Sequence, residues 1–218
     1  MQKMGGIAAL IGAATNLLAL VVFLTLLAPK GYGSDDPAQL VAFLADNHAV
    51  MRVWYLVIYL VFGVSMIFLS VALYERLNAG SAALAQAATT VGLIWAVLVI
   101  VVGTLSINNL STVVKLYAEN PAQAAAAWVT LDSVETGLGG GGGETMVNAL
   151  WLLLLSWAAL QARELSRALN LLGVVVGVAG ILAVVLEPVL AAVYGLGLIM
   201  WFVWLGIALL RSKPGTIA

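Results

Sequence analysis

Long apolar runs alternate with short polar stretches along the whole chain. A membrane-spanning helix needs about 20 mostly apolar residues, and six runs reach or approach that length. They cover roughly residues 5–28, 51–74, 84–110, 144–161, 169–187 and 189–210. We therefore predict an all-α fold, an integral membrane bundle of six transmembrane helices that forms a single domain over residues 1–218.

The composition supports a lipid environment. Hydrophobic residues make up 63% of the chain and charged residues 9%, whereas soluble domains carry about 25% charged residues. Because so few charges do not cover a surface in water, we expect the lipid bilayer as the main partner. The first apolar run is longer than the roughly 7–15 apolar residues of a signal peptide, so we expect it to be retained as a span.

Basic residues concentrate on one side of the predicted bundle. That side, made of the two termini and two short turns, carries Lys3, Arg76, Arg163, Arg167, Arg211 and Lys213. The opposite side carries Lys30, Arg52 and Lys115. An excess of Lys and Arg is typical of the cytoplasmic side. We therefore expect a multi-pass protein of the plasma membrane, with both termini cytoplasmic and the connections 29–50 and 111–143 outside.

Each of these two connections contains a signal for a helix start. Asp36-Pro37 and Asn120-Pro121 both place an N-cap residue before a proline at the first helical position. We predict two short extracytoplasmic helices, at 37–47 and 121–135. In the second helix, Trp128 is expected at the level of the lipid headgroups, where tryptophan is enriched.

Five consecutive glycines, Gly139–Gly143, precede Glu144. A phosphate-binding P-loop needs a lysine and a hydroxyl residue after its last glycine, but here Glu144-Thr145 follows. Since a carboxylate repels phosphate, we interpret the run as a connector. Neither a nucleotide nor a nucleic acid is expected as a partner.

The chain has few residues that could bind a cofactor or a metal. The chain has no cysteine, and His48 is its single histidine, so thiolate sites and haem held by two histidines are excluded. His48 and Met51 are the remaining candidate pair of haem ligands. The simpler interpretation is that His48 is a solvated histidine. Because His48 lies outside the predicted spans, an intramembrane serine–histidine pair is excluded as well. We predict no catalytic residues, no cofactor and no metal.

Eight polar residues are candidates for a polar cavity. They are Asn16 in mid-span and, nearer the outer face, Asp46, His48, Arg52, Asn108, Glu144, Asn148 and Glu187. One hypothesis is that they line an outward-facing cavity, in which Arg52 pairs with an acid. The alternative, which applies to Asn16 above all, is hydrogen bonding that holds helices together.

Two local features bear on the packing of the last two spans. Glu187-Pro188 is interpreted as a tight outer hairpin, and the alternative is a helix broken at membrane depth with Glu187 inside. Gly173, Gly177 and Gly180 fall on one face of a helix, which allows another backbone to approach closely. We expect the partner of this stripe within the same bundle. The alternative is another membrane protein or a second copy.

Three stretches resemble a known family. They are "HAVMRVWYLVIYLVFGVSMIFLSVALYERL" (48–77), "WLLLLSWAALQARELSRALNLLGVVVGVAGIL" (151–182) and "GLGLIMWFVWLGIALLR" (195–211). The chain thereby resembles the small six-span bacterial membrane proteins of domain-of-unknown-function family four-three-eight-six. The resemblance implies a membrane fold but no activity, so it transfers no functional residues.

Three classes of function remain open. The first is a non-enzymatic scaffold, accessory or regulatory membrane component, which the scarcity of buried charge and the glycine stripe favour. The second is a carrier of small solutes or ions with an outward-facing polar cavity. The third is a lipid-acting intramembrane enzyme, for which only Glu144 and Glu187 are available as acids. Of these, we expect the first, and the carrier of small solutes or ions is the alternative.

Overall fold

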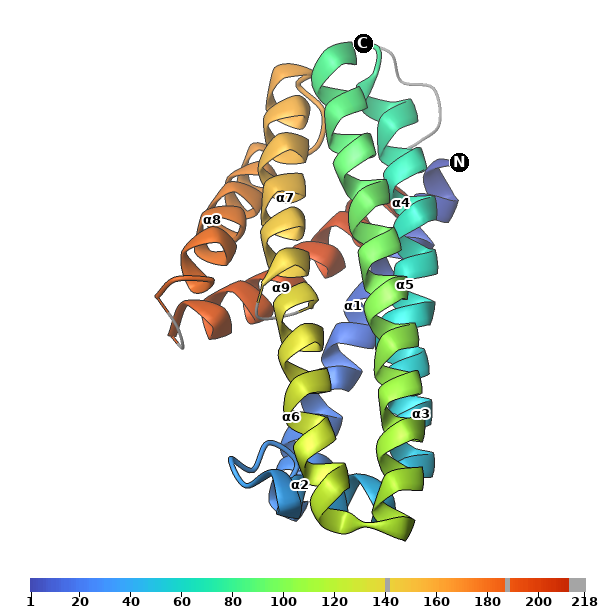
Figure 1. Cartoon of the computed structure of the whole chain (residues 1–218). Coiled ribbons are helices and arrows are strands. Elements are labelled where there is room, and N and C mark those ends of the chain that lie inside the picture. The colour runs from blue at the N-terminus through green and yellow to red at the C-terminus, as the bar shows by residue number, and fades with distance from the viewer. Residues whose placement is uncertain (140–141, 187–188, 212–218) are drawn as a thin grey trace.

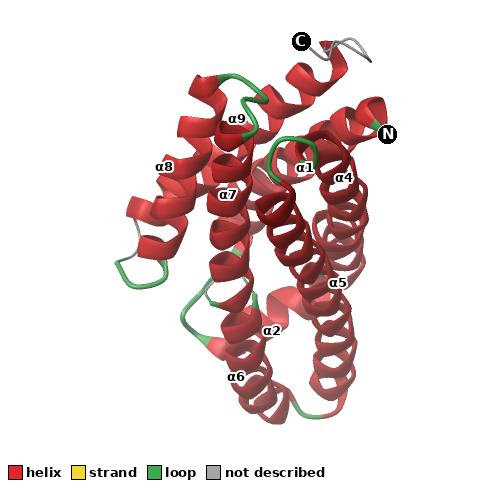
Figure 2. Cartoon of the chain, turned by 90° about the horizontal axis from the view of Figure 1, so that it is seen from above, coloured by secondary structure: helices red, strands yellow, loops and turns green. Residues whose placement is uncertain are grey.

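The structure of the chain is a computed structural model, and it describes residues 1–139, 142–186 and 189–211. Within these ranges the regular structure is helical throughout (Figures 1 and 2). The elements are α1 (Gln2–Val22), η1 (Phe23–Leu27), η2 (Ala28–Lys30), α2 (Pro37–Asp46), α3 (His48–Tyr55), η3 (Leu56–Val61), α4 (Phe62–Leu77), α5 (Ala82–Glu119), α6 (Pro121–Leu138), α7 (Gly143–Gln161), α8 (Arg167–Ala183) and α9 (Val189–Arg211). Two of them, η1 and η3, are π-helical segments. The all-α class predicted from the sequence is confirmed.

Five helical segments are long and apolar enough to cross a membrane. They are Gln2–Lys30, His48–Leu77, Ala82–Glu119, Pro121–Gln161 and Val189–Arg211. The apolar helix α8 has 17 residues, which is shorter than the roughly 20 that a span needs. The sixth span and the outer location of α2 and α6 therefore stay predictions.

The helices α4, α5 and α7 run side by side, and α8 packs against both α7 and α9 (Figure 1). Helix α1 packs against α4 and α9. The first turn of α1 meets the last turn of α9, because the Gln2 side chain donates a hydrogen bond to the Leu209 carbonyl at 3.2 Å. At the same end the α4–α5 turn contacts the end of α7, where Ser81 Oγ donates a hydrogen bond to Gln161 Oε1 at 2.8 Å.

The centre of the bundle is filled by aromatic rings. Trp95 lies 5.3 Å from both Phe62 and Trp151, measured between ring centroids, and Trp151 lies 5.5 Å from Trp201. These rings come from four different helices. Such pairs add about 0.5–1.5 kcal/mol each beyond the burial of their area. This aromatic core therefore holds α4, α5, α7 and α9 together.

A second apolar core lies among α2, α3, α6 and the C-terminal half of α5. Helix α5 has 38 residues, which at 1.5 Å per residue gives about 57 Å. The hydrocarbon layer is only about 30 Å thick, so we expect one or both ends of α5 to project from the bilayer. Helix α6 folds back along α5, and Trp128 is 6% exposed within the second core. Its expected place at the headgroup level stays a prediction.

Both predicted N-caps are present. Asp36 accepts a hydrogen bond from the Ala38 amide at 2.9 Å, and Asn120 accepts one from the Gln123 amide at 3.2 Å. We expect Asn120→Ala to destabilise the protein by about 1 kcal/mol, since an N-H group of α6 loses its partner. Thermal unfolding in detergent measures this loss. Asn78→Ala is the control, because Asn78 is exposed at the end of α4, and an equal loss in both variants would contradict the role of the cap.

Candidate functional site

Glu135 of α6 binds two side chains of α5. Its carboxylate accepts hydrogen bonds from Ser106 Oγ and from Asn109 Nδ2, the latter at 3.0 Å. Ser106 and Asn109 are 1% and 2% exposed. Their spacing of three residues places them on one face of α5, and the fold-back of α6 brings Glu135 against that face.

Glu144 stands in the first turn of α7, where a negative charge suits the helix dipole. Its carboxyl group faces the Trp95 indole, and Trp95 Nε1 has no hydrogen-bond partner among the described residues. Gly139 lies close to it, since a Cβ at Gly139 would be 3.9 Å from Glu144 Oε2. The residue is partly exposed at the surface of the bundle.

Tyr59 is a neighbour of both acids. It lies close to Ser106 and near enough to Glu135 and Glu144 for their charges to act on it. Tyr59 belongs to the π-helical segment η3 and packs tightly against Gly103 of α5. Such π segments are frequent at functional sites because they redirect a side chain. We call Glu135, Glu144, Tyr59, Ser106 and Asn109 the acidic cluster.

Polar side chains extend from the acidic cluster in two directions. On one side Asn148 donates a hydrogen bond to the Tyr194 hydroxyl, which joins α7 to α9. On the other side the Tyr59 ring lies 6.1 Å from that of Tyr55, and the Tyr55 and Tyr32 hydroxyls are 3.3 Å apart. Burial raises the pKa of Tyr32 to about 12. Tyr32 is therefore a neutral hydrogen-bonding group at physiological pH.

The acidic cluster has no basic counterpart in the described part of the chain. The ion pair found there joins Arg76 Nε to Glu164 Oε2 at 2.7 Å, at the end where α4 meets the α7–α8 turn. Nor is there, among the described residues, a group of three or more His, Cys, Asp or Glu side chains placed to hold a metal. The charge of Glu135 and Glu144 is therefore not balanced by a described Lys, Arg or His.

The structure brings two of the eight predicted cavity residues, Glu144 and Asn148, to the acidic cluster and its extension. His48 and Arg52 line a separate small pocket of about 250 Å³ together with Lys115, and Arg52 donates to Ser111 Oγ at 3.2 Å.

Three of the other four predicted residues lie elsewhere. Asn16 donates to the Gly12 carbonyl of its own helix at 2.8 Å, and Asp46 and Asn108 are exposed. Glu187, with the predicted hairpin at Glu187-Pro188, lies outside the described residues. Gly140 and Gly141 of the glycine run do too.

Sequence reasoning missed Glu135, Tyr59, Ser106 and Asn109. A signal for Glu135 was present, because it follows Trp128 by seven residues and shares its helical face. Ser106 and Asn109 likewise share a face of α5. Each signal depends on α6 packing against α5, a contact that the sequence pattern does not show.

The glycine stripe of α8 contacts helices of the same chain. Gly173 packs against Ser156, and a Cβ at Gly177 would lie 3.0 Å from the Ala149 carbonyl oxygen of α7. A Cβ at Gly180 would lie 2.8 Å from the Tyr194 ring. The helices that pack closely against the stripe therefore belong to the same bundle.

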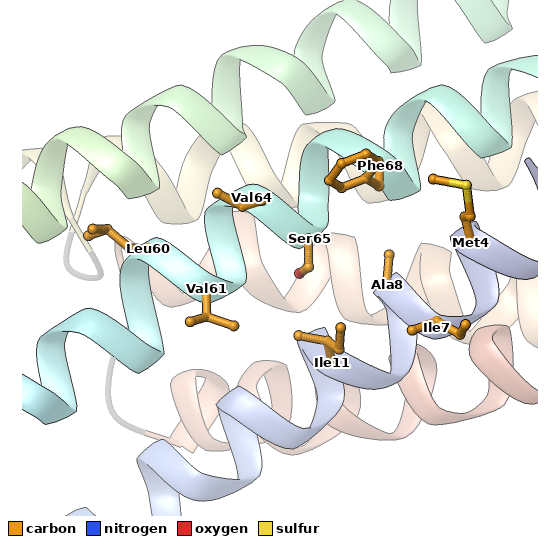
Figure 3. Close-up of a pocket in the computed structure, with 9 residues that line it drawn as sticks. All are labelled: Met4, Ile7, Ala8, Ile11, Leu60, Val61, Val64, Ser65 and Phe68. Carbon is orange, nitrogen blue, oxygen red and sulfur yellow. The ribbon is translucent and has the colours of Figure 1, made fainter.

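A larger groove runs between α1 and the η3–α4 segment (Figure 3). It measures about 500 Å³, and eight of its nine lining residues are apolar. The exception, Ser65, donates its hydroxyl to the Phe62 carbonyl at 2.7 Å. With His48 in another pocket, Ser65 has no histidine beside it, so this groove offers an apolar surface rather than a catalytic site.

Comparison with known proteins identifies one matching family. The family described as a domain of unknown function (DUF4386) matches residues 4–209. Among curated proteins and among solved structures, nothing matches the chain.

Proposed function

The chain belongs to the DUF4386 family, a family of unknown function, and from the acidic cluster we propose that it is a membrane carrier in which protons and small monovalent cations compete for the same carboxylates. One observation carries the proposal. Glu135 and Glu144 lie at helix contacts in an apolar protein, and no described basic residue balances them.

The energetics of buried charge favour a carrier over a scaffold. An unpaired carboxylate in a low-dielectric interior costs several kcal/mol, so it takes up a proton or a cation. Ionisable residues within membrane bundles typically mark ion or proton pathways. A scaffold needs no such residues, and the glycine stripe that favoured a scaffold is occupied by α7 and α9 of the same chain.

The ligand atoms suit a small hard cation. The cluster offers carboxylate, hydroxyl and amide groups from α5, α6 and α7, and oxygen is the donor that hard cations prefer. The row formed by Tyr59, Tyr55 and Tyr32 adds hydroxyl groups between this site and the α2 end of the bundle. These features support ion exchange, while the apolar groove lacks the acid–base groups of a lipid-acting enzyme.

The proposal predicts a melting temperature that depends on cations. Saturation at 100 times the dissociation constant stabilises a folded protein by about 2.7 kcal/mol. We therefore expect Na⁺ or K⁺, compared with choline at equal ionic strength, to raise the melting temperature of the purified protein. Glu135→Gln should abolish this rise because it removes a ligand charge.

Glu119→Gln is the matched control, since Glu119 is exposed at the end of α5. It should keep the response to cations. A wild-type protein that does not respond, or a Glu135→Gln variant that responds like the wild type, would contradict cation binding by the acidic cluster.

A further inference from the structure

The turn between α7 and α8 encloses a polar pocket of about 420 Å³. Arg163, Glu164, Arg167 and Asn170 line it, and apolar residues at the end of α7 close one side. This pocket lies far from Glu135 and Glu144, at the end of the bundle where α1 begins and α9 ends (Figure 1).

The pocket carries a net positive charge. Its single acid, Glu164, is paired with Arg76 at 2.7 Å. The guanidinium groups of Arg163 and Arg167 form no ion pair or hydrogen bond with the described residues. Two arginines are thus free to bind an anion from outside the chain.

The turn that carries these arginines is held in a fixed conformation. Arg163 and Leu165 adopt φ values of 54° and 61°, which is uncommon for any residue with a side chain and strained for leucine. The buried Asn170 donates to the Glu164 carbonyl at 3.1 Å and fastens the turn to α8. Strain of this kind persists where the surroundings impose it, often at binding sites.

The neighbouring side chains suit a pocket at the edge of the lipid. Trp157 on α7 and Leu171 on α8 are 60% and 51% exposed, and each lies about one turn from the pocket on an apolar helix. Exposed tryptophan is enriched where hydrocarbon meets headgroups. Lys3, on the first turn of α1, adds another basic residue at this end.

We propose that this pocket binds the phosphate of an anionic phospholipid. Two guanidinium groups match the oxygen pairs of a phosphodiester, and basic pockets between membrane helices suit anionic headgroups. The acyl chains would lie along the exposed apolar faces of α7 and α8. This inference does not depend on the proposed transport function.

Native mass spectrometry of the purified protein tests this site by counting bound phosphatidylglycerol. We expect the wild type to bind one phosphatidylglycerol molecule with higher affinity than phosphatidylcholine. Its affinity for phosphatidylglycerol should fall about fivefold in Arg163→Gln or in Arg167→Gln. The double variant should lose the preference for the anionic lipid. Arg211→Gln, which removes an exposed arginine at the same end, should bind like the wild type.

Two results would overturn the proposal. One is a double variant that still prefers phosphatidylglycerol as the wild type does. The other is inorganic phosphate that displaces the lipid at equal concentration, which would assign the pocket to free phosphate. If the double Gln variant does not fold, the double Lys variant keeps both charges but loses the bidentate geometry, and unchanged lipid affinity there would contradict a built phosphate site.

Discussion

Replacing Gly92 by valine is expected to disrupt the assembly of the helical bundle. A Cβ at this position would lie 2.5 Å from Trp151 Nε1 and 2.6 Å from Ser70 Oγ. Both side chains are buried, and Trp151 packs against Trp95 and Trp201. The new atoms therefore force the indole or a helix backbone to move. Overpacking costs about 1–3 kcal/mol and occasionally more, and we expect the upper end here.

Gly195→Val is the matched control for this substitution. Gly195 also lies within a helix, but a Cβ there would meet no atom within 4 Å. Thermal unfolding followed by circular dichroism should show a large loss for Gly92→Val and little change for Gly195→Val. Equal melting temperatures for the two variants would contradict the close packing of α5 against α7.

Glu144→Gln is expected to stabilise the protein while it removes the response to cations. The substitution keeps the shape of the side chain but deletes an unbalanced charge from the interior, which is worth roughly 1–4 kcal/mol by analogy with replaced buried ions. The lost interaction with the α7 dipole costs only about 0.3–1 kcal/mol. The net change should therefore be stabilising.

Chemical denaturation of both proteins, in choline and in Na⁺ or K⁺, measures the two effects together. Glu119→Gln again serves as the control for an exposed acid. If the Glu144→Gln variant is less stable than the wild type and still responds to cations, Glu144 has a structural role. That result would favour the scaffold class.

The sequence was sufficient to predict the helical class and the two N-caps. Apolar runs of spanning length report burial directly, because each one must leave water whatever it packs against. The caps at Asp36 and Asn120 are local, and the hydrogen bond of each is made within three residues. Neither prediction required knowledge of a distant contact.

The acidic cluster depends on contacts that hydropathy does not encode. Helix α5 is apolar on most of its surface, so the pattern does not say whether Asn108 or its neighbour Asn109 faces inward. In the structure Asn109 is 2% exposed and bonds to Glu135, while Asn108 is exposed. That choice is made by α6, which folds back after Asn120-Pro121 and presents Trp128 and Glu135 to α5.

The central claim is that Glu135 and Glu144 exchange protons for small cations. The most direct measurement is the internal pH of proteoliposomes that enclose a pH-sensitive dye and are exposed to an inward gradient of Na⁺ or K⁺. The account predicts that the gradient raises internal pH in wild-type vesicles, as protons leave in exchange, and that the Glu135→Gln/Glu144→Gln protein responds like protein-free vesicles. A wild-type protein that shows no pH change under either gradient, or a double variant as active as the wild type, would contradict it.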